Sequence, residues 1–225
     1  ANEISDKLGL SRDEKQELIL GANRIMQNLD DRGTADGMPL KTFEYIGKFA
    51  EILSRSGGEA YVPRMTRLTT AGGISGLLIE PPCGSNTCVF WNDDAVLAVD
   101  TGFTCYSEEL SALLHDYVPG FAEKEKILFL THPDVDHTGA MDLFDRVYLS
   151  RTAVEHFEKE RAGVPACRED NPLHAPYVRI CKVLSRYRPP ENIDMIPIEP
   201  DDSCPVLGRP KDSLMLPAGR IDVLG

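Results

Sequence analysis

The chain has 225 residues, is 42% hydrophobic and 27% charged, and carries a formal net charge of -12; apart from the acidic balance these values are ordinary for a globular protein. The acidic balance disfavours a nucleic-acid substrate and an anionic membrane surface, because both bind proteins through Lys and Arg. No apolar run approaches the ~20 residues that cross a bilayer, and no signal peptide is visible. We therefore expect a cytoplasmic protein in which Ala1 follows a removed initiator Met; a cleaved export signal is the alternative.

Residues 1–60 are predicted to form an N-terminal helical extension of two amphipathic helices. Ser11-Arg12-Asp13-Glu14 is a capping box, in which the Ser and Glu side chains each bond a backbone N–H at the start of the helix. Apolar residues follow at helical spacing: Leu18, Ala22, Ile25, Met26 and Leu29. The second helix is expected over residues 41–55, before Gly57-Gly58. Both apolar stripes are typical of helices packed on a main domain; an arm that binds a partner or covers an active site is the alternative.

Short strands are predicted next, in a main domain that we expect over residues 61–225. Runs separated by Gly-Gly, Pro-Pro and Asn-Asp-Asp turns predict strands over residues 65–70, 74–80, 87–91 and 96–99. Ser107 can cap a helix that continues to about Tyr117. Further helices are expected from about Ala140 and over residues 178–184. Later strands are expected over residues 147–149, 193–198, 213–216 and 220–224.

An apolar run over residues 127–130 predicts a buried strand, and it ends in a loop rich in potential metal ligands. Four such side chains fall within six residues: His132, Asp134, Asp136 and His137. A loop at the end of a buried strand is a rigid place for a site, and alternate residues of an extended loop point the same way. Imidazole and carboxylate together suit zinc, iron or manganese. The pattern predicts a metal centre; a polar turn that merely ends the strand is the other reading.

The loop His132-Pro133-Asp134-Val135-Asp136-His137 resembles the signature loop of the metallo-β-lactamase superfamily. The usual signature is His-x-His-x-Asp-His, so an Asp stands at position 134 in place of the second His. Upstream, Val96 to Gly102 is similar to the family's strand that ends in Asp-Thr-Gly. The resemblance covers roughly residues 65–155. It implies an α/β fold, the αββα sandwich of the metallo-β-lactamase type.

The same resemblance implies roles for the four loop residues. His132 and Asp134 would serve a first metal. Asp136 and His137 would serve a second. Asp136 would also accept the proton of the attacking water, which makes it the predicted catalytic residue.

Three neighbouring residues are assigned supporting roles by the resemblance. Asp100 would orient a ligand His through the ring nitrogen that does not bind metal. Thr131 or Thr138 would hydrogen-bond the ligand carboxylates. Asp100 and one or the other threonine would hold the metal ligands in place without touching the metal.

The anionic Asp134, where the family has a neutral His, bears on the identity of the metal. An added negative charge favours hard cations and weakens the Lewis acidity of the bound ions. Zinc, as one or two ions, remains the first expectation. Iron and manganese are the alternatives.

The family also requires a third metal His, a bridging Asp and a last His after the loop. After His137 the sequence offers only His156, in a segment predicted as an exposed helix, and His174, in a predicted loop. Residues 220–225 look like the strand that precedes the family's third ligand motif. We therefore expect the sandwich to be incomplete in this chain, with the later half of the domain on a cleaved or separately encoded polypeptide or in a remainder beyond Gly225. A second polypeptide would then complete the metal site in an oligomer.

These features favour a metal-dependent hydrolase that activates water at a mono- or dinuclear site. The expected small-molecule substrate is an ester, lactone, amide or phosphoester. One alternative is a diiron oxidoreductase of the same superfamily, which uses the same loop plan to reduce oxygen or nitric oxide. The other is a non-catalytic, degenerate subunit that has lost the later ligands.

The six cysteines show no Cys-x-x-Cys pair, so a structural zinc knuckle is not expected. Free thiols are predicted, with a disulfide between Cys83 and Cys88 as the alternative.

The helix predicted over residues 178–184, with the segment after it, carries a basic face: Arg179, Lys182, Arg186 and Arg188. A solvated face is favoured over a contact with an anionic substrate.

Overall fold

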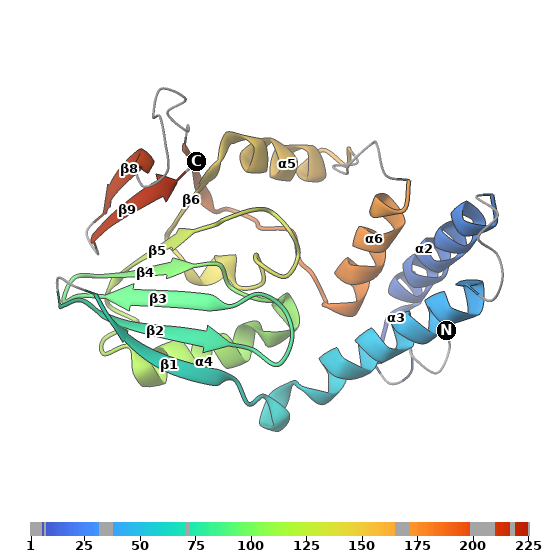
Figure 1. Ribbon diagram of the computed structural model, residues 1–225, viewed down its shortest axis with the longest axis horizontal. Coiled ribbons are helices and arrows are strands. Elements are labelled where there is room, and N and C mark those ends of the chain that lie inside the picture. The colour runs from blue at the N-terminus through green and yellow to red at the C-terminus, as the bar shows by residue number, and fades with distance from the viewer. Residues whose placement is uncertain are drawn as a thin grey trace.

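A mixed sheet of seven strands forms the centre of the molecule (Figure 1). The computed structural model describes residue 6 and residues 8–31, 38–70, 73–164, 172–198, 210–216 and 219–224. The strands lie side by side in chain order: β1 (Arg64–Thr69), β2 (Ser75–Glu80), β3 (Thr87–Trp91), β4 (Ala95–Val99), β5 (Glu125–Phe129), β6 (Arg146–Ser150) and β7 (Asp194–Ile198). Neighbours from β1 to β4 are antiparallel and neighbours from β4 to β7 are parallel. The carboxyl ends of the parallel strands therefore meet at one edge of the sheet.

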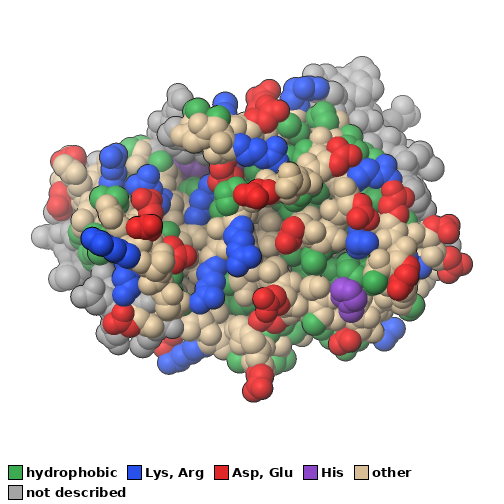
Figure 2. Space-filling model, turned by 180° about the vertical axis from the view of Figure 1, so that it is seen from behind, with side chains coloured by type: hydrophobic (Ala, Val, Ile, Leu, Met, Phe, Trp, Pro, Cys, Tyr) green, Lys and Arg blue, Asp and Glu red, His purple; other side chains and the backbone are tan. Residues whose placement is uncertain are grey.

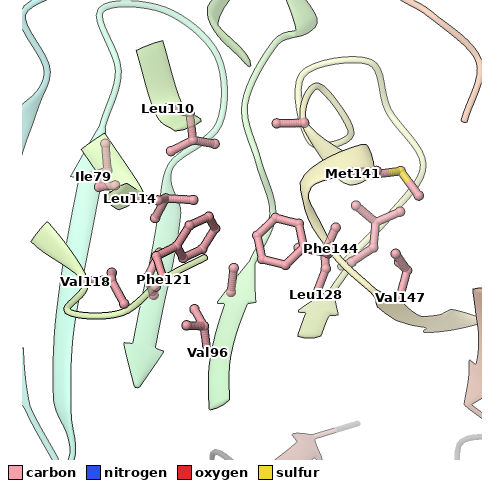
Figure 3. Close-up of a cluster of buried hydrophobic side chains, with 14 of the residues drawn as sticks. Ile79, Val96, Leu110, Leu114, Val118, Phe121, Leu128, Met141, Phe144 and Val147 are labelled. Atoms are coloured by element: carbon pink, nitrogen blue, oxygen red, sulfur yellow. The ribbon is translucent and has the colours of Figure 1, made fainter. Parts of the chain in front are cut away.

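One face of the sheet is covered by helices α4 (Ser107–Tyr117) and α5 (Arg151–Arg161). Leu110 and Leu114 of α4 are buried against Val96 and Leu128, which point to this face from β4 and β5 (Figure 3). Phe157 brings α5 into the same cluster. Burial of each such side chain stabilises the fold by about 1.5–3 kcal/mol. This cluster is the main core, and it fixes the strands whose ends carry the site.

The other face of the sheet is apolar at its centre as well. Ala95, Leu97 and Ile127 are buried together, with Phe129 and Tyr148 partly buried beside them. Apolar residues on both faces of parallel strands are typical of sheets covered on both sides. The seven-stranded sheet, its flanking helices and the N-terminal helices confirm the predicted α/β fold class.

Helices α2 (Arg12–Asp31), α3 (Met38–Arg55) and α6 (His174–Leu184) lie together at one end of the sheet (Figure 1). A second apolar cluster joins Leu18 of α2, Leu53 of α3 and Ile180 of α6 to Phe103 and Tyr106, which follow β4. The hydroxyl of Tyr106 donates to the carbonyl of Leu53 at 3.2 Å. This is the packed arrangement that the two apolar stripes predict.

The predicted capping box starts α2. The backbone N–H of Ser11 donates to Glu14 Oε2 at 2.7 Å, and the N–H of Glu14 donates to Ser11 Oγ at 3.2 Å. Two orphan N–H groups at the helix start are thereby satisfied.

Two helix predictions are wrong in part. The helix expected from about Ala140 is a single 3-10 turn, η3 (Met141–Leu143), because the chain must reach β6 at Arg146. His174, predicted in a loop, is the first residue of α6. Pro176 lies in the first turn of that helix, where backbone N–H groups have no partner within the helix. A Pro at this position is therefore compatible with the helix and does not indicate a loop.

The basic face predicted on α6 and the segment after it is exposed at Arg179, Arg186 and Arg188, as expected, and Lys182 is partly buried. Arg179 Nε lies 3.0 Å from a carboxylate oxygen of Glu17 on α2, and Lys182 pairs with Glu160 on α5. The basic side chains of α6 therefore bind neighbouring helices.

The remaining elements are short. Two 3-10 turns, η1 (Gly58–Ala60) and η2 (Thr104–Tyr106), precede β1 and α4. The two segments predicted as late strands are β8 (Pro210–Leu216) and β9 (Gly219–Leu224), which pair with each other as an antiparallel hairpin outside the main sheet. The four described thiols are free: Cys83, Cys88, Cys105 and Cys181. Cys167 and Cys204 lie outside the described residues.

None of the described helices is long and apolar enough to span a bilayer. Acidic and basic side chains are interspersed on the face of the molecule that Figure 2 shows.

Candidate metal centre

The loop with the predicted ligands leaves the carboxyl end of β5, beside the end of β4. In open α/β sheets this edge is where ligands bind. A turn in which the N–H of His137 donates to the carbonyl of Asp134 at 2.9 Å folds the loop back. The loop begins at Leu130, whose N–H is held by the carbonyl of Tyr148 on β6 at 2.8 Å.

The Asp100-Thr101-Gly102 segment clamps this loop. The N–H and hydroxyl of Thr101 both donate to the carbonyl of His137, at 2.8 and 3.0 Å. The N–H of Gly139 donates to the carbonyl of Gly102 at 2.8 Å. A Cβ on Gly139 would lie 2.1 Å from the carbonyl carbon of Phe103, so only glycine fits at that contact. Segments separated by more than thirty residues are thus locked together by their backbones.

Asp100 lies at the centre of a hydrogen-bond network that holds both imidazoles. It accepts from the N–H of Thr131 at 2.9 Å and from the Thr131 hydroxyl at 2.7 Å. Nδ1 of His137 lies 2.8 Å from Asp100 Oδ2, and Nδ1 of His132 lies 3.0 Å from Thr131 Oγ1. Asp100 has a positive φ of 55°, a conformation that costs energy in a residue with a side chain and is often found at functional sites.

This network determines which ring nitrogen can bind a metal. A carboxylate only accepts hydrogen bonds, so Nδ1 of His137 carries the proton and Nε2 presents a lone pair. The Thr131 hydroxyl donates to Asp100, so it accepts from Nδ1 of His132, and Nε2 is again the available atom. The role of Asp100 in orienting a metal-bound His stays a prediction.

Two pairs of donor atoms result. His132 Nε2 lies 3.5 Å from Asp134 Oδ2, and His137 Nε2 lies 3.6 Å from Asp136 Oδ2. Two ligands of one tetrahedral zinc, with bonds near 2.1 Å, lie about 3.4 Å apart. The chemistry and spacing of each pair therefore fit a shared metal ion better than a direct hydrogen bond. The two imidazole rings lie next to each other, with centroids 3.8 Å apart.

Each pair is only part of a coordination shell. Zinc takes three or four protein ligands in most sites. Within the described ranges, no three His, Cys, Asp or Glu side chains are arranged to hold one ion. The second pair is the more enclosed, with side chains 17% exposed at His137 and 33% at Asp136 against 46% at His132 and 53% at Asp134.

The pKa of His137 reflects opposing influences. Burial acts to lower it, whereas the hydrogen bond and charge of Asp100 and the charge of Asp136 act to raise it, and the net direction is upward. The surrounding carboxylates therefore stabilise a positive charge at this imidazole, and a bound metal would take the place of the second proton.

Thr138 does not contact a carboxylate. Its hydroxyl donates to the backbone carbonyl of Asp134 at 3.4 Å, which steadies the turn of the loop. Of the two threonines considered, Thr131 is the one bonded to a carboxylate, that of Asp100.

A cavity borders the loop, and its walls include residues that sequence reasoning did not place there. Asp134 and Asp136 line it from the loop, His156 from α5, and His174 from the start of α6. His156 is half-buried, so the prediction of an exposed position is wrong. The α6 residues on the wall recur at helical spacing, a signal that is readable in the sequence: His174, Tyr177, Val178, Cys181 and Lys182.

Comparisons with known proteins give matches only among solved structures. No family model matches the chain, and no curated protein matches it. The subclass B3 metallo-β-lactamase BJP-1 of Bradyrhizobium japonicum is 14% identical, over 42% of this chain and 35% of that one, with a TM-score of 0.35. The metallo-β-lactamase GOB-18 of Elizabethkingia meningoseptica is 15% identical, over 64% and 48%, with a TM-score of 0.43. A putative metallo-β-lactamase of Thermotoga maritima is 11% identical, over 64% and 60%, with a TM-score of 0.32.

The chain thus spans less than two thirds of the length of each of these structures. The first two are named as metallo-β-lactamases and the third as a putative one, the superfamily whose signature loop the sequence resembles. At this level of identity the likeness concerns the fold alone, so the function is argued from the geometry of the site.

Proposed function

We propose that this chain is a metal-dependent hydrolase that activates water at a mono- or dinuclear site on the loop of residues 132–137. The observation that supports this best is the pair of Nε2–carboxylate spacings, 3.5 and 3.6 Å, beside rings whose Nδ1 atoms are already engaged. His132 and Asp134 would hold one ion, and Asp136 and His137 a second. When bound, zinc lowers the pKa of a coordinated water towards neutrality and polarises a carbonyl or phosphoryl oxygen.

The chain's own residues have separate tasks in this proposal. Asp100 keeps the proton on Nδ1 of His137 and fixes the orientation of the ring. Asp136 holds a carboxylate oxygen beside the reacting centre, where it accepts the proton of the attacking water. The cavity next to the loop binds the substrate and limits the access of bulk water.

Further ligands are part of the proposal, because each pair supplies two donors. We propose that they come from a second polypeptide, or from the remainder of a longer chain, carrying at least two His and an Asp. Intact mass spectrometry of the material purified from its native source tests this. A second polypeptide or a longer chain supports the proposal, and a fully active, monodisperse species of residues 1–225 alone contradicts it.

The ligand assignment is tested by elemental analysis of three variants. His132→Ala and His137→Ala each remove an Nε2 donor, and we expect both to lose bound zinc and hydrolysis together. His115→Ala is the matched control, because that imidazole lies exposed on α4 with Nδ1 2.8 Å from the carbonyl of Ser111. Full metal content in both loop variants would refute the assignment.

Two other functions are distinguished by the same analysis. Asp134 makes the ligand set richer in carboxylate, which favours iron or manganese over zinc. Bound iron with an oxygen-dependent activity would support a diiron oxidoreductase. A native preparation that takes up no metal would support a non-catalytic subunit.

We also propose a cytoplasmic location, supported by the four free thiols among the described residues. Fractionation of the source cells tests it.

A further inference from the structure

The cavity beside the metal loop has a volume of about 330 Å³. Ligand pockets run from about 300 to 1,000 Å³, so this one accepts a small organic group. One wall is the loop itself, from Pro133 to Asp136, and another is helix α6. A group bound here would therefore lie next to the proposed reacting centre.

Aromatic and aliphatic side chains make up much of the lining. Phe49 and Phe103 form a tilted pair with ring centroids 6.0 Å apart. Val135 of the loop and Val178 of α6 add aliphatic surface, and Tyr177 adds a further ring. Such a surface binds an acyl or aryl group by burying apolar area.

The charged side chains around the cavity offer little to bind an anionic ligand. Among the described residues that line it, Lys182 is the only Lys or Arg, and its ammonium pairs with Glu160, a largely buried carboxylate. Burial lowers the pKa of His156, which favours its neutral form. An ionised group on the ligand would lose its hydration against the aromatic and aliphatic lining, and the one Lys among the described lining residues is already paired with Glu160.

Phe49 belongs to α3, in the N-terminal helical extension. The residues around it on that helix are buried in the cluster that joins α2, α3 and α6: Ile46, Ala50 and Leu53. The ring of Phe49 is therefore held against Phe103 by the packing of the whole helical group. Among the described residues of the extension, Phe49 is the one that lines the cavity.

We propose that the cavity binds the uncharged acyl or aryl part of an ester, lactone or amide, and that Phe49 determines which group fits. This rests on the proposed hydrolase function and narrows its substrate class to compounds whose acyl or aryl group carries no charge. The N-terminal helices thereby form part of the substrate site.

Binding of two matched probes tests the proposal on the purified protein. Hexanamide and the monoamide of adipic acid share the amide and the alkyl chain, but the second ends in a carboxylate. We expect hexanamide to bind at least about tenfold more tightly in calorimetric or ligand-observed NMR titrations. Equal or tighter binding of the adipic monoamide would overturn the proposal.

Substitutions at two positions of α3 test whether Phe49 contacts the bound hexanamide. Phe49→Ala is expected to weaken hexanamide binding by about tenfold, the scale of losing apolar contacts in a pocket. Phe43→Ala is the control, because Phe43 packs in the same cluster but does not line the cavity. Phe49→Leu keeps apolar bulk and should retain most of the affinity. Equal losses in Phe43→Ala and Phe49→Ala, with folding verified by circular dichroism, would overturn the role of Phe49.

Metal content, measured on the same samples, separates the two proposals. A preference for hexanamide in protein that takes up no metal would leave the pocket assignment standing while the hydrolase proposal fails. If the protein binds metal but does not bind hexanamide more tightly than the adipic monoamide, the proposal for the cavity is rejected and the hydrolase proposal is not.

Discussion

At the scale of the residue, Asp100 organises the candidate metal centre. Its two oxygens accept hydrogen bonds from Thr131, and Oδ2 also lies 2.8 Å from Nδ1 of His137. Through the Thr131 hydroxyl it also determines the tautomer of His132. Its positive φ of 55° is maintained by the clamp between the Asp-Thr-Gly segment and the loop. One buried carboxylate thus positions a donor of each proposed metal pair.

Asp100→Asn is therefore expected to weaken zinc binding by about 10–100-fold, the usual effect of removing a group that orients a ligand. The amide would favour the wrong tautomer of His137, because its NH₂ group donates where the carboxylate accepts. Competition with a chromogenic chelator measures the affinity. Asp116→Asn, on the exposed side of α4, is the control, and equal zinc affinity in the two variants would contradict the role of Asp100.

At the scale of the element, the position of α6 depends on a close contact with α2. Gly21 faces α6 at a place where a Cβ would lie 2.8 Å from Ile180 Cγ1 and 3.2 Å from the carbonyl oxygen of Pro176. The Arg179–Glu17 ion pair joins the same two helices. Since α6 forms a wall of the cavity, this contact sets the distance between that wall and the loop.

A larger residue at position 21 should separate the two helices. Gly21→Val adds atoms where none fit, and we expect it to lower the free energy of unfolding by about 1–3 kcal/mol. Leu20→Val, exposed on the same helix, controls for the low helix propensity of Val and should cost less than about 1 kcal/mol. Denaturant titrations of both variants give the comparison. No difference between them would mean that α2 and α6 are not in close contact.

At the scale of the whole molecule, two histidines near the cavity give the stability opposite dependences on pH. The pKa of His156 is lowered from its ordinary 6.5, mainly by burial, so the unfolded chain binds its proton more tightly than the folded one. Its contribution to stability is present above 6.5 and is lost as pH falls below that value. The pKa of His137 is raised, so its contribution is present below 6.5 and is lost as pH rises through the folded-state pKa.

His156→Gln should remove the loss of stability on the acid side of pH 6.5. We expect the melting temperature of this variant to fall less steeply than that of the wild type as pH drops below that value. Thermal melts across the range provide the measurement. His115→Gln, a change at an exposed residue of α4, should follow the wild-type profile, and a His156→Gln profile that also follows it would show that burial does not perturb this imidazole.

The sequence by itself determined the features that depend on local pattern. The apolar runs located the strands, because a buried strand needs consecutive apolar residues, and the capping box located the start of α2. The dense set of donors in residues 132–137 identified the candidate centre, since those residues are adjacent in the chain. The Asp-Thr-Gly segment was recognisable by resemblance.

Only the tertiary structure decided which distant residues surround that centre. Asp100 and His137 are 37 positions apart, and Phe49, His156 and His174 come from three different helices. Their meeting depends on how helices pack on the sheet and on each other, and local periodicity does not encode that packing. For the same reason His156 was predicted as exposed: its own helix is largely polar, and its burial comes from neighbouring elements.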